Sequence, residues 1–150
     1  MYRASVDIGA LPEQVFSFMT DPGRLRQWQP DVGESYPLPE GGLCVGAVLR
    51  ATVQEYGRRF EVQLRVTSLV RNQHVAYEME APMASVRSEF RLTRAGDKTR
   101  VEHLVTLKPK GFGRLLLPLM PGMIRRKLQS RLELLRRALE TEAASRQAAG

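Results

Sequence analysis

The chain has 150 residues, 43% of them hydrophobic, and a formal net charge of +7. This length fits one domain with a sizeable core, and this composition excludes a disordered chain. We therefore expect a single domain over residues 1–150. The longest mostly apolar run, residues 115–124, contains two prolines and is about half as long as a membrane span requires.

The positive charge is concentrated in one part of the chain. Residues 108–137 sum to +8, so the remaining residues sum to −1. Cys44 is the single cysteine, which excludes an intramolecular disulfide and fits a reducing compartment. The first residues already follow a strand pattern rather than that of a signal peptide. We expect a cytoplasmic protein that is a monomer or a homodimer.

The first 32 residues predict a strand that leads directly into two short helices. Val6 and Ile8 alternate with polar or small neighbours, which is the period of a half-buried strand. Pro12 suits the first turn of a helix, where no N–H bond is lost. Asp21, followed by a proline, is a typical N-cap for a second helix, whose Trp28 would face inward.

Antiparallel strands occupy most of the middle of the chain. A short strand around residues 34–36 interrupts a connection rich in proline and glycine. Beyond it, apolar and charged residues alternate, which predicts strands with one buried and one solvated face. These strands are expected at residues 47–54, 60–67, 75–80, 86–93 and 100–107.

A long helix is predicted at the C-terminal end. Its apolar stripe has spacings of four, four, three and four residues, which is typical of a helix that packs on one face. The stripe consists of Ile124, Leu128, Leu132, Leu135 and Leu139. Glycines and prolines in residues 111–122 predict a loop or a broken first segment of this helix. We expect the alanine-rich residues 143–150 to be a frayed tail.

A curved sheet that wraps around one helix leaves space on its concave face, which predicts a pocket of a few hundred cubic ångströms. Most of the side chains expected to face that space are apolar, so the ligand would be hydrophobic. We expect it to contact Trp28, Val53, Phe60, Leu64, Tyr77, Met79, Ser88, Phe90, His103, Met120, Ile124 and Leu128.

The order of elements, together with the stretches ALPEQVF (residues 10–16) and DPGRLRQW (residues 21–28), resembles a known superfamily. It is similar to START/Bet v 1-like (SRPBCC) proteins, in particular bacterial polyketide cyclase/dehydrase and lipid-transport-like members. The resemblance implies an α+β helix-grip fold, in which a curved antiparallel sheet of six to seven strands wraps around the long C-terminal helix. The superfamily contains carriers, cyclases, hydrolase-like enzymes and co-chaperones. The resemblance therefore assigns no catalytic residue.

Two inward residues could act on a bound ligand. His103 could shuttle a proton, or could be a buried neutral histidine bonded to a neighbour. Tyr77 could donate its hydroxyl to a ligand carbonyl, or could be a core aromatic residue. No inward carboxylate assists them, because Glu102 points to the opposite face. Whether the protein is an enzyme stays open at this point.

Other site types lack their required residues. Cys44 has no evident base beside it, and one cysteine with two histidines does not make a metal site. The glycines at 41, 42 and 46 lack the Lys-Ser/Thr pair of a phosphate loop. We therefore expect no cofactor and no metal. The loop 37–46 and the segment 109–122 would instead form a movable entrance to the pocket.

The basic segment has three interpretations. Its arginines could form the solvated back of the helix, which is the simplest interpretation. Arg114, Arg125, Arg126 and Lys127 could instead flank residues 115–124 as a contact with an anionic membrane surface. Nucleic-acid binding is the weakest interpretation, because interleaved aromatic residues and a recognition motif are missing.

These observations rank three hypotheses. The first is a carrier that binds a lipid, polyketide or isoprenoid between the sheet and the C-terminal helix. The second is a polyketide cyclase or dehydratase that uses His103 and Tyr77. The third is a module that docks to a membrane or a partner through the basic segment.

Overall fold

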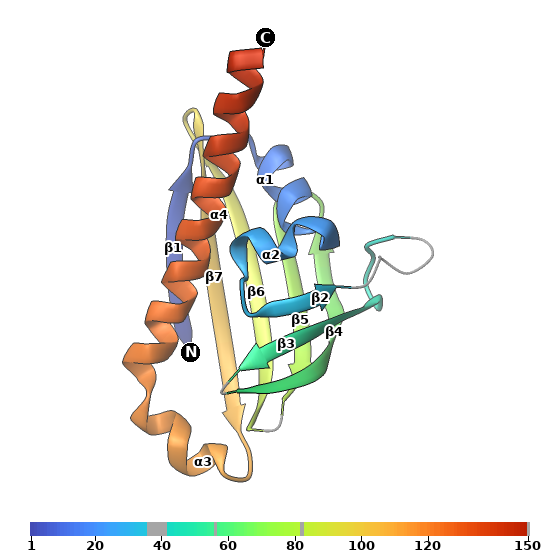
Figure 1. The fold of residues 1–150 in the computed structure, drawn as a ribbon, viewed down its shortest axis with the longest axis vertical. Coiled ribbons are helices and arrows are strands. Elements are labelled where there is room, and N and C mark those ends of the chain that lie inside the picture. Colours follow the sequence, from blue (N-terminus) through green and yellow to red (C-terminus); the bar gives the residue numbers. More distant parts are fainter. Residues whose placement is uncertain (36–41, 56, 82, 150) are drawn as a thin grey trace.

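The structure is a computed structural model that describes residues 1–35, 42–55, 57–81 and 83–149. Within these residues, seven strands form one antiparallel sheet in the order β1-β7-β6-β5-β4-β3-β2. The sheet curls beside the long helix α4 (Figure 1), which confirms the predicted α+β helix-grip fold. The strands are β1 (Tyr2–Ile8), β2 (Val32–Ser35), β3 (Val48–Glu55), β4 (Arg58–Val70), β5 (His74–Glu80), β6 (Ala84–Ala95) and β7 (Lys98–Pro109).

The helices after β1 form where the sequence predicts them. Helix α1 spans Pro12–Met19, and its proline lies in the first turn. A 3₁₀ turn, Pro22–Arg24, leads into α2, Leu25–Trp28. The Asp21 carboxylate caps this turn by accepting a hydrogen bond of 2.9 Å from the backbone N–H of Gly23. Helix α2 packs against α4 and β2, and Trp28 is only 2% exposed.

The strands confirm the predicted alternation and differ from the predicted bounds by three residues or fewer. On β7, Val101, His103 and Val105 are buried, whereas Arg100 points to solvent. Strand β2 begins at Val32, earlier than expected, and residue 36 of its predicted range lies outside the described residues. The predicted entrance loop 37–46 is described only from residue 42 onward.

The segment before the terminal helix is helical but broken. It forms α3 (Gly113–Leu116), a 3₁₀ turn (Leu117–Leu119) and then α4 (Pro121–Ala149). Prolines at 118 and 121 explain the break, because a proline cannot donate a helical hydrogen bond. Helix α4 continues through residues 143–149, where a frayed tail was expected. Alanine has the highest helix propensity of all residues, which accounts for this difference.

The core lies between α4, the N-terminal helices and the sheet. The stripe of α4 faces it, since Leu128, Leu132, Leu135 and Leu139 are buried. Ile124, the first residue of the stripe, is only half-buried. The core therefore closes over the later turns of α4 and is less complete over its first turns.

Helix α3 is held against the loop that precedes β6. The backbone N–H of Lys110 donates a hydrogen bond of 3.0 Å to the carbonyl oxygen of Met83. A Cβ atom added to Gly113 would lie 2.0 Å from the same oxygen. Two non-bonded atoms cannot approach this closely, so only glycine, which has no Cβ, permits α3 to pack here.

We therefore expect Gly113→Ala to lower the free energy of unfolding by about 2 kcal/mol, as overpacking commonly does. Gly122→Ala is the matched control, because a Cβ at Gly122 meets no atom within 4 Å. That change should be neutral or stabilising by up to about 1 kcal/mol, since alanine favours the helix. Urea denaturation measures both, and equal stability of the two variants would contradict this packing.

Candidate functional site

The strand register brings inward side chains into rows that cross the concave face. Directly paired residues of antiparallel strands share one face of the sheet. The histidine row contains Ala4, His103, Phe90, Val75 and Leu69. The tyrosine row contains Tyr2, Val105, Ser88, Tyr77 and Val66. The outer row, nearest α3, contains Leu107, Val86, Met79, Leu64 and Leu49.

Burial decreases from the histidine row to the outer row. Val75, Phe90 and His103 are buried, and so are Val66 and Tyr77 in the next row. Every member of the outer row is only half-buried, although all five side chains are apolar and face inward. The outer row is therefore covered less completely than the other two rows, although Ala51, Val62 and Ala84, two residues further along the same strands, are buried again.

The ligand-contacting residues predicted from the sequence divide along this gradient. All lie on the concave face, on α2, on α4, or, in the case of Met120, just before α4. The buried ones are Trp28, Tyr77, Phe90, His103 and Leu128. The half-buried ones are Val53, Phe60, Leu64, Met79, Ser88, Met120 and Ile124.

Aromatic rings fill the middle of the concave face. The ring of Phe90 stacks on the His103 imidazole with centroids 4.0 Å apart and planes 9° apart. Trp28 meets Phe90 edge-on at 5.7 Å. On the neighbouring strand, Ser88 Oγ lies 2.7 Å from His103 Nε2, a hydrogen-bond distance. Trp28 therefore packs in the interior.

His103 and Tyr77 are both neutral at neutral pH. Burial, assisted by the positive charge of Arg131, lowers the pKa of His103 to about 3. Burial raises the pKa of Tyr77 to about 12. An acid–base catalyst works best when its pKa lies near the operating pH. In this arrangement the two residues are better suited to donate or accept a hydrogen bond than to transfer a proton.

A charged cluster joins the end of α2 to α4, and sequence reasoning missed it. Asp31 Oδ2 lies 2.9 Å from Arg131 Nη2 and 3.4 Å from Lys127 Nζ. Burial opposes the ionisation of Asp31, but the charges of Arg131 and Lys127 outweigh it and hold the pKa of Asp31 below its ordinary value. Burial lowers the pKa of Lys127. The available signal was the four-residue spacing of Lys127 and Arg131 beside the apolar stripe.

Lys127 is therefore placed differently from the other predicted membrane-contact residues. It is half-buried and faces Asp31, whereas Arg114, Arg125 and Arg126 are exposed. The aspartate holds Lys127 in the protein, because a partly buried ammonium group requires a counter-charge.

Three buried nitrogens have no hydrogen-bond partner in the described part of the chain: Trp28 Nε1, His103 Nδ1 and Arg131 Nε. Indole and guanidinium nitrogens can only donate, and a neutral imidazole nitrogen can donate or accept. Buried polar groups of this kind normally bind protein atoms, water or a ligand. The interior thus offers hydrogen bonds beside its apolar surface.

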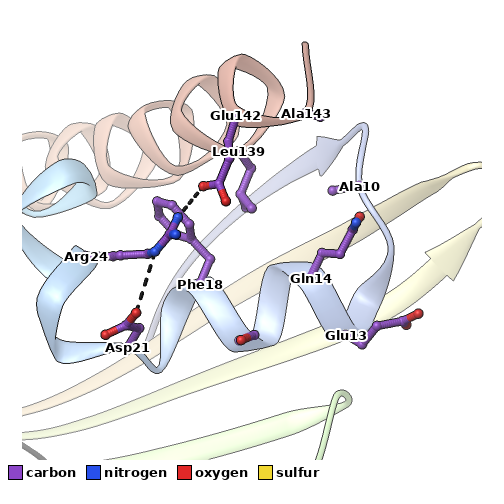
Figure 2. Close-up of a pocket in the computed structure, with 10 residues that line it drawn as sticks. Ala10, Glu13, Gln14, Phe18, Asp21, Arg24, Leu139, Glu142 and Ala143 are labelled. Carbon is purple, nitrogen blue, oxygen red and sulfur yellow. Dashed lines mark hydrogen bonds and ion pairs between the residues drawn. The ribbon is translucent and has the colours of Figure 1, made fainter. Parts of the chain in front are cut away.

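A pocket of about 320 Å³ lies in a different place, between α1 and the last turns of α4. Figure 2 shows Arg24 reaching toward Asp21 on one side and Glu142 on the other. The guanidinium also lies over the Phe18 ring at 5.1 Å. Charged residues form much of the lining, which differs from the apolar pocket expected from the sequence. The lining consists of Ala10, Glu13, Gln14, Ser17, Phe18, Asp21, Arg24, Leu139, Glu142 and Ala143.

No group of three or more His, Cys, Asp or Glu residues among the described residues is arranged to hold a metal ion. Cys44 is exposed and carries a free thiol. No helix in the described ranges combines the length and apolar character needed to cross a membrane.

Nearly the whole chain is similar to known proteins in fold and in sequence family. No curated protein matches it. Many solved structures share its fold, among them the following three. Protein CV1439 from Chromobacterium violaceum has 19% identity and a TM-score of 0.73, covering 92% of this chain and 95% of its own. Ara h 8.0201 has 15% identity and a TM-score of 0.73, with 93% and 97% covered. A START superfamily protein from Mycobacterium smegmatis has 19% identity and a TM-score of 0.69, with 95% and 96% covered.

The family model described as "Polyketide cyclase / dehydrase and lipid transport" matches residues 2–140. This match spans β1 through the buried stripe of α4, and therefore includes all three rows of the concave face. It confirms the resemblance stated from residues 10–16 and 21–28. The chain belongs to the polyketide cyclase/dehydrase and lipid transport family, and it shares its fold with Ara h 8.0201 and the START superfamily protein.

Proposed function

We propose that the protein binds one small hydrophobic molecule, such as a lipid, polyketide or isoprenoid, on the concave face of its sheet. The outer row of Leu49, Leu64, Met79, Val86 and Leu107 carries this proposal, because these inward apolar side chains are only half-buried. Covering apolar surface gains about 25 cal/mol per Å². A ligand laid along this row would gain that energy, and the family match supports such a role.

Polar groups next to the outer row favour a ligand with one oxygen. Tyr77 and Ser88 pair with each other in the neighbouring row, and His103 lies one row further in. Within the described residues, His103 Nδ1 has no hydrogen-bond partner. A ligand carbonyl or hydroxyl group could bond to one of these side chains while its carbon skeleton covers the outer row. We include a cytoplasmic location in the proposal, which the free thiol of Cys44 supports.

An enzymatic role for His103 and Tyr77 is the weaker hypothesis. Burial holds the pKa of His103 at about 3 and the pKa of Tyr77 at about 12. Neither residue therefore has a pKa near neutrality. The family description names both enzymes and transport, so membership does not choose between the two roles.

Blocking the outer row tests the binding proposal. Val86→Phe places a ring among the half-buried side chains, and we expect it to weaken binding of the fluorescent probe 1-anilinonaphthalene-8-sulfonate at least tenfold. Val48→Phe is the matched control, because Val48 is 42% exposed and pairs with Arg65 on the opposite face. Fluorescence titration gives the three dissociation constants. Equal affinity in all three proteins, or no binding by the unmodified protein, would refute the proposal.

A further inference from the structure

The segment from the end of β7 to the first turn of α4 exposes several large apolar side chains. Phe112, Leu115 and Leu119 are 72%, 70% and 77% exposed, and Leu116 and Met123 are 37% and 43% exposed. We call these five residues the α3 surface. Isolated exposed apolar residues are common on soluble proteins, whereas a group of this kind marks an interaction site.

The local fold keeps the α3 surface away from the core. Proline at 118 and 121 interrupts the helix, so this segment does not continue the buried stripe of α4. Gly113 and Lys110 hold its other end against Met83. Figure 1 shows α3 at one end of the molecule, beyond the end of β7. The side chains therefore point outward from a fixed segment.

The bases next to the α3 surface have no acidic partner among the described residues. These are Lys108, Arg114, Arg125 and Arg126, all exposed. Other bases of the same segment are paired, as Lys110 is with Glu80 and Arg136 is with Glu133. The positive charge of the segment is thus left uncompensated around the apolar side chains.

We propose that the α3 surface docks onto an anionic lipid bilayer. Its apolar side chains enter the boundary between headgroups and acyl chains, and Arg114, Arg125 and Arg126 contact the lipid phosphates. This combination is typical of interfacial membrane binding. A second copy of the chain is a poorer partner, because it would bring like charges together.

Membrane docking through the α3 surface is a separate activity from ligand binding and does not depend on it. It would nevertheless place the half-buried outer row near the bilayer, because Gly113 packs on Met83 and Val86 of the outer row lies three residues later. A ligand carried on the outer row could then exchange with the membrane over a short path.

Sedimentation with vesicles tests the proposal. We expect the protein to bind vesicles of 30% phosphatidylglycerol in phosphatidylcholine at least tenfold more tightly than vesicles of phosphatidylcholine alone. The triple variant Arg114→Gln, Arg125→Gln, Arg126→Gln should lose at least tenfold in affinity for the anionic vesicles. The double variant Leu115→Gln, Leu119→Gln should lose a similar factor without losing folded structure, because both leucines are exposed.

The matched charge control is Arg71→Gln, Arg94→Gln, Lys98→Gln, which removes the same charge from exposed positions in the turn after β4, near the end of β6 and at the start of β7. It should bind as the unmodified protein does. Equal losses in both triple variants would overturn the proposal, since net charge alone would then explain binding. Absent vesicle binding would also overturn it, as would a dimer that the leucine double variant dissociates in light-scattering measurements.

Discussion

Acidification from pH 7 to pH 4 is expected to destabilise the folded protein by about 3 kcal/mol through His103 alone. Burial lowers the pKa of this imidazole from 6.5 to about 3 in the folded state. Between pH 6.5 and pH 3, His103 is therefore protonated in the unfolded chain but stays neutral in the folded chain. His103 therefore costs no folding stability above pH 6.5, and the loss of stability grows as the pH falls from 6.5 toward 3.

The variant His103→Gln isolates this contribution. Glutamine cannot titrate, yet its side chain can still form a hydrogen bond with Ser88, the neighbour 2.7 Å from His103 Nε2. Urea denaturation at pH 7 and at pH 4 gives the unfolding free energy of each protein. Between these two pH values, the histidine protein should lose about 3 kcal/mol more of this free energy than the glutamine variant does. A difference that stays constant over this range would mean that His103 is not buried as a neutral group.

Replacing a side chain of the α4 stripe by alanine is expected to lower the free energy of unfolding by a similar amount, but only where that side chain is fully buried. Leu132→Ala should cost about 3 kcal/mol, because Leu132 is fully buried and the deletion leaves a cavity. Ile124→Ala should cost about 1 kcal/mol, because Ile124 is only half-buried in the first turn of α4. Both changes are made in the same helix face, so the comparison reports the local packing.

Urea denaturation of the two variants measures this difference directly. Arg137→Ala, at an exposed position of α4, serves as the surface control and should change stability by less than about 0.5 kcal/mol. If Ile124→Ala and Leu132→Ala cost the same, the concave face is as well packed beside α3 as in its middle. The uncovered outer row would then have no support.

The sequence predicts the fold well because its strongest signals are periodic. Alternation on β7 places His103 inward and Arg100 outward, and the structure confirms both. The α4 stripe is equally clear, since apolar residues spaced three or four apart are typical of a helix that packs on one face. The Asp21 cap and the proline in the first turn of α1 are local signals that do not depend on distant contacts.

The sequence does not predict how well the space inside this fold is filled. The outer row and the histidine row have the same alternation, yet they differ in burial. That difference depends on how the first turns of α4 lie relative to the sheet, which long-range packing determines. For the same reason, the pocket of the structure between α1 and the end of α4 was not anticipated from any motif.

Ion pairs between residues far apart in the chain could not be predicted from the sequence either. Asp31 and Arg131 are 100 residues apart, and neither belongs to a recognisable motif. Asp31 also pairs with Lys127, which explains why Lys127 is held in the protein while Arg125 and Arg126, its immediate neighbours, remain exposed. The protonation of His103 was likewise open, because it depends on burial and on the nearby charge of Arg131.

Methyl-selective NMR of the protein titrated with dodecanoate tests the location of the ligand most directly. We predict chemical-shift changes at the outer-row methyls of Leu49, Leu64, Val86 and Leu107, with little change at the buried methyls of Leu132. Changes concentrated instead at Leu139, which lines the pocket beside α1, would contradict the account, as would a spectrum that dodecanoate leaves unchanged.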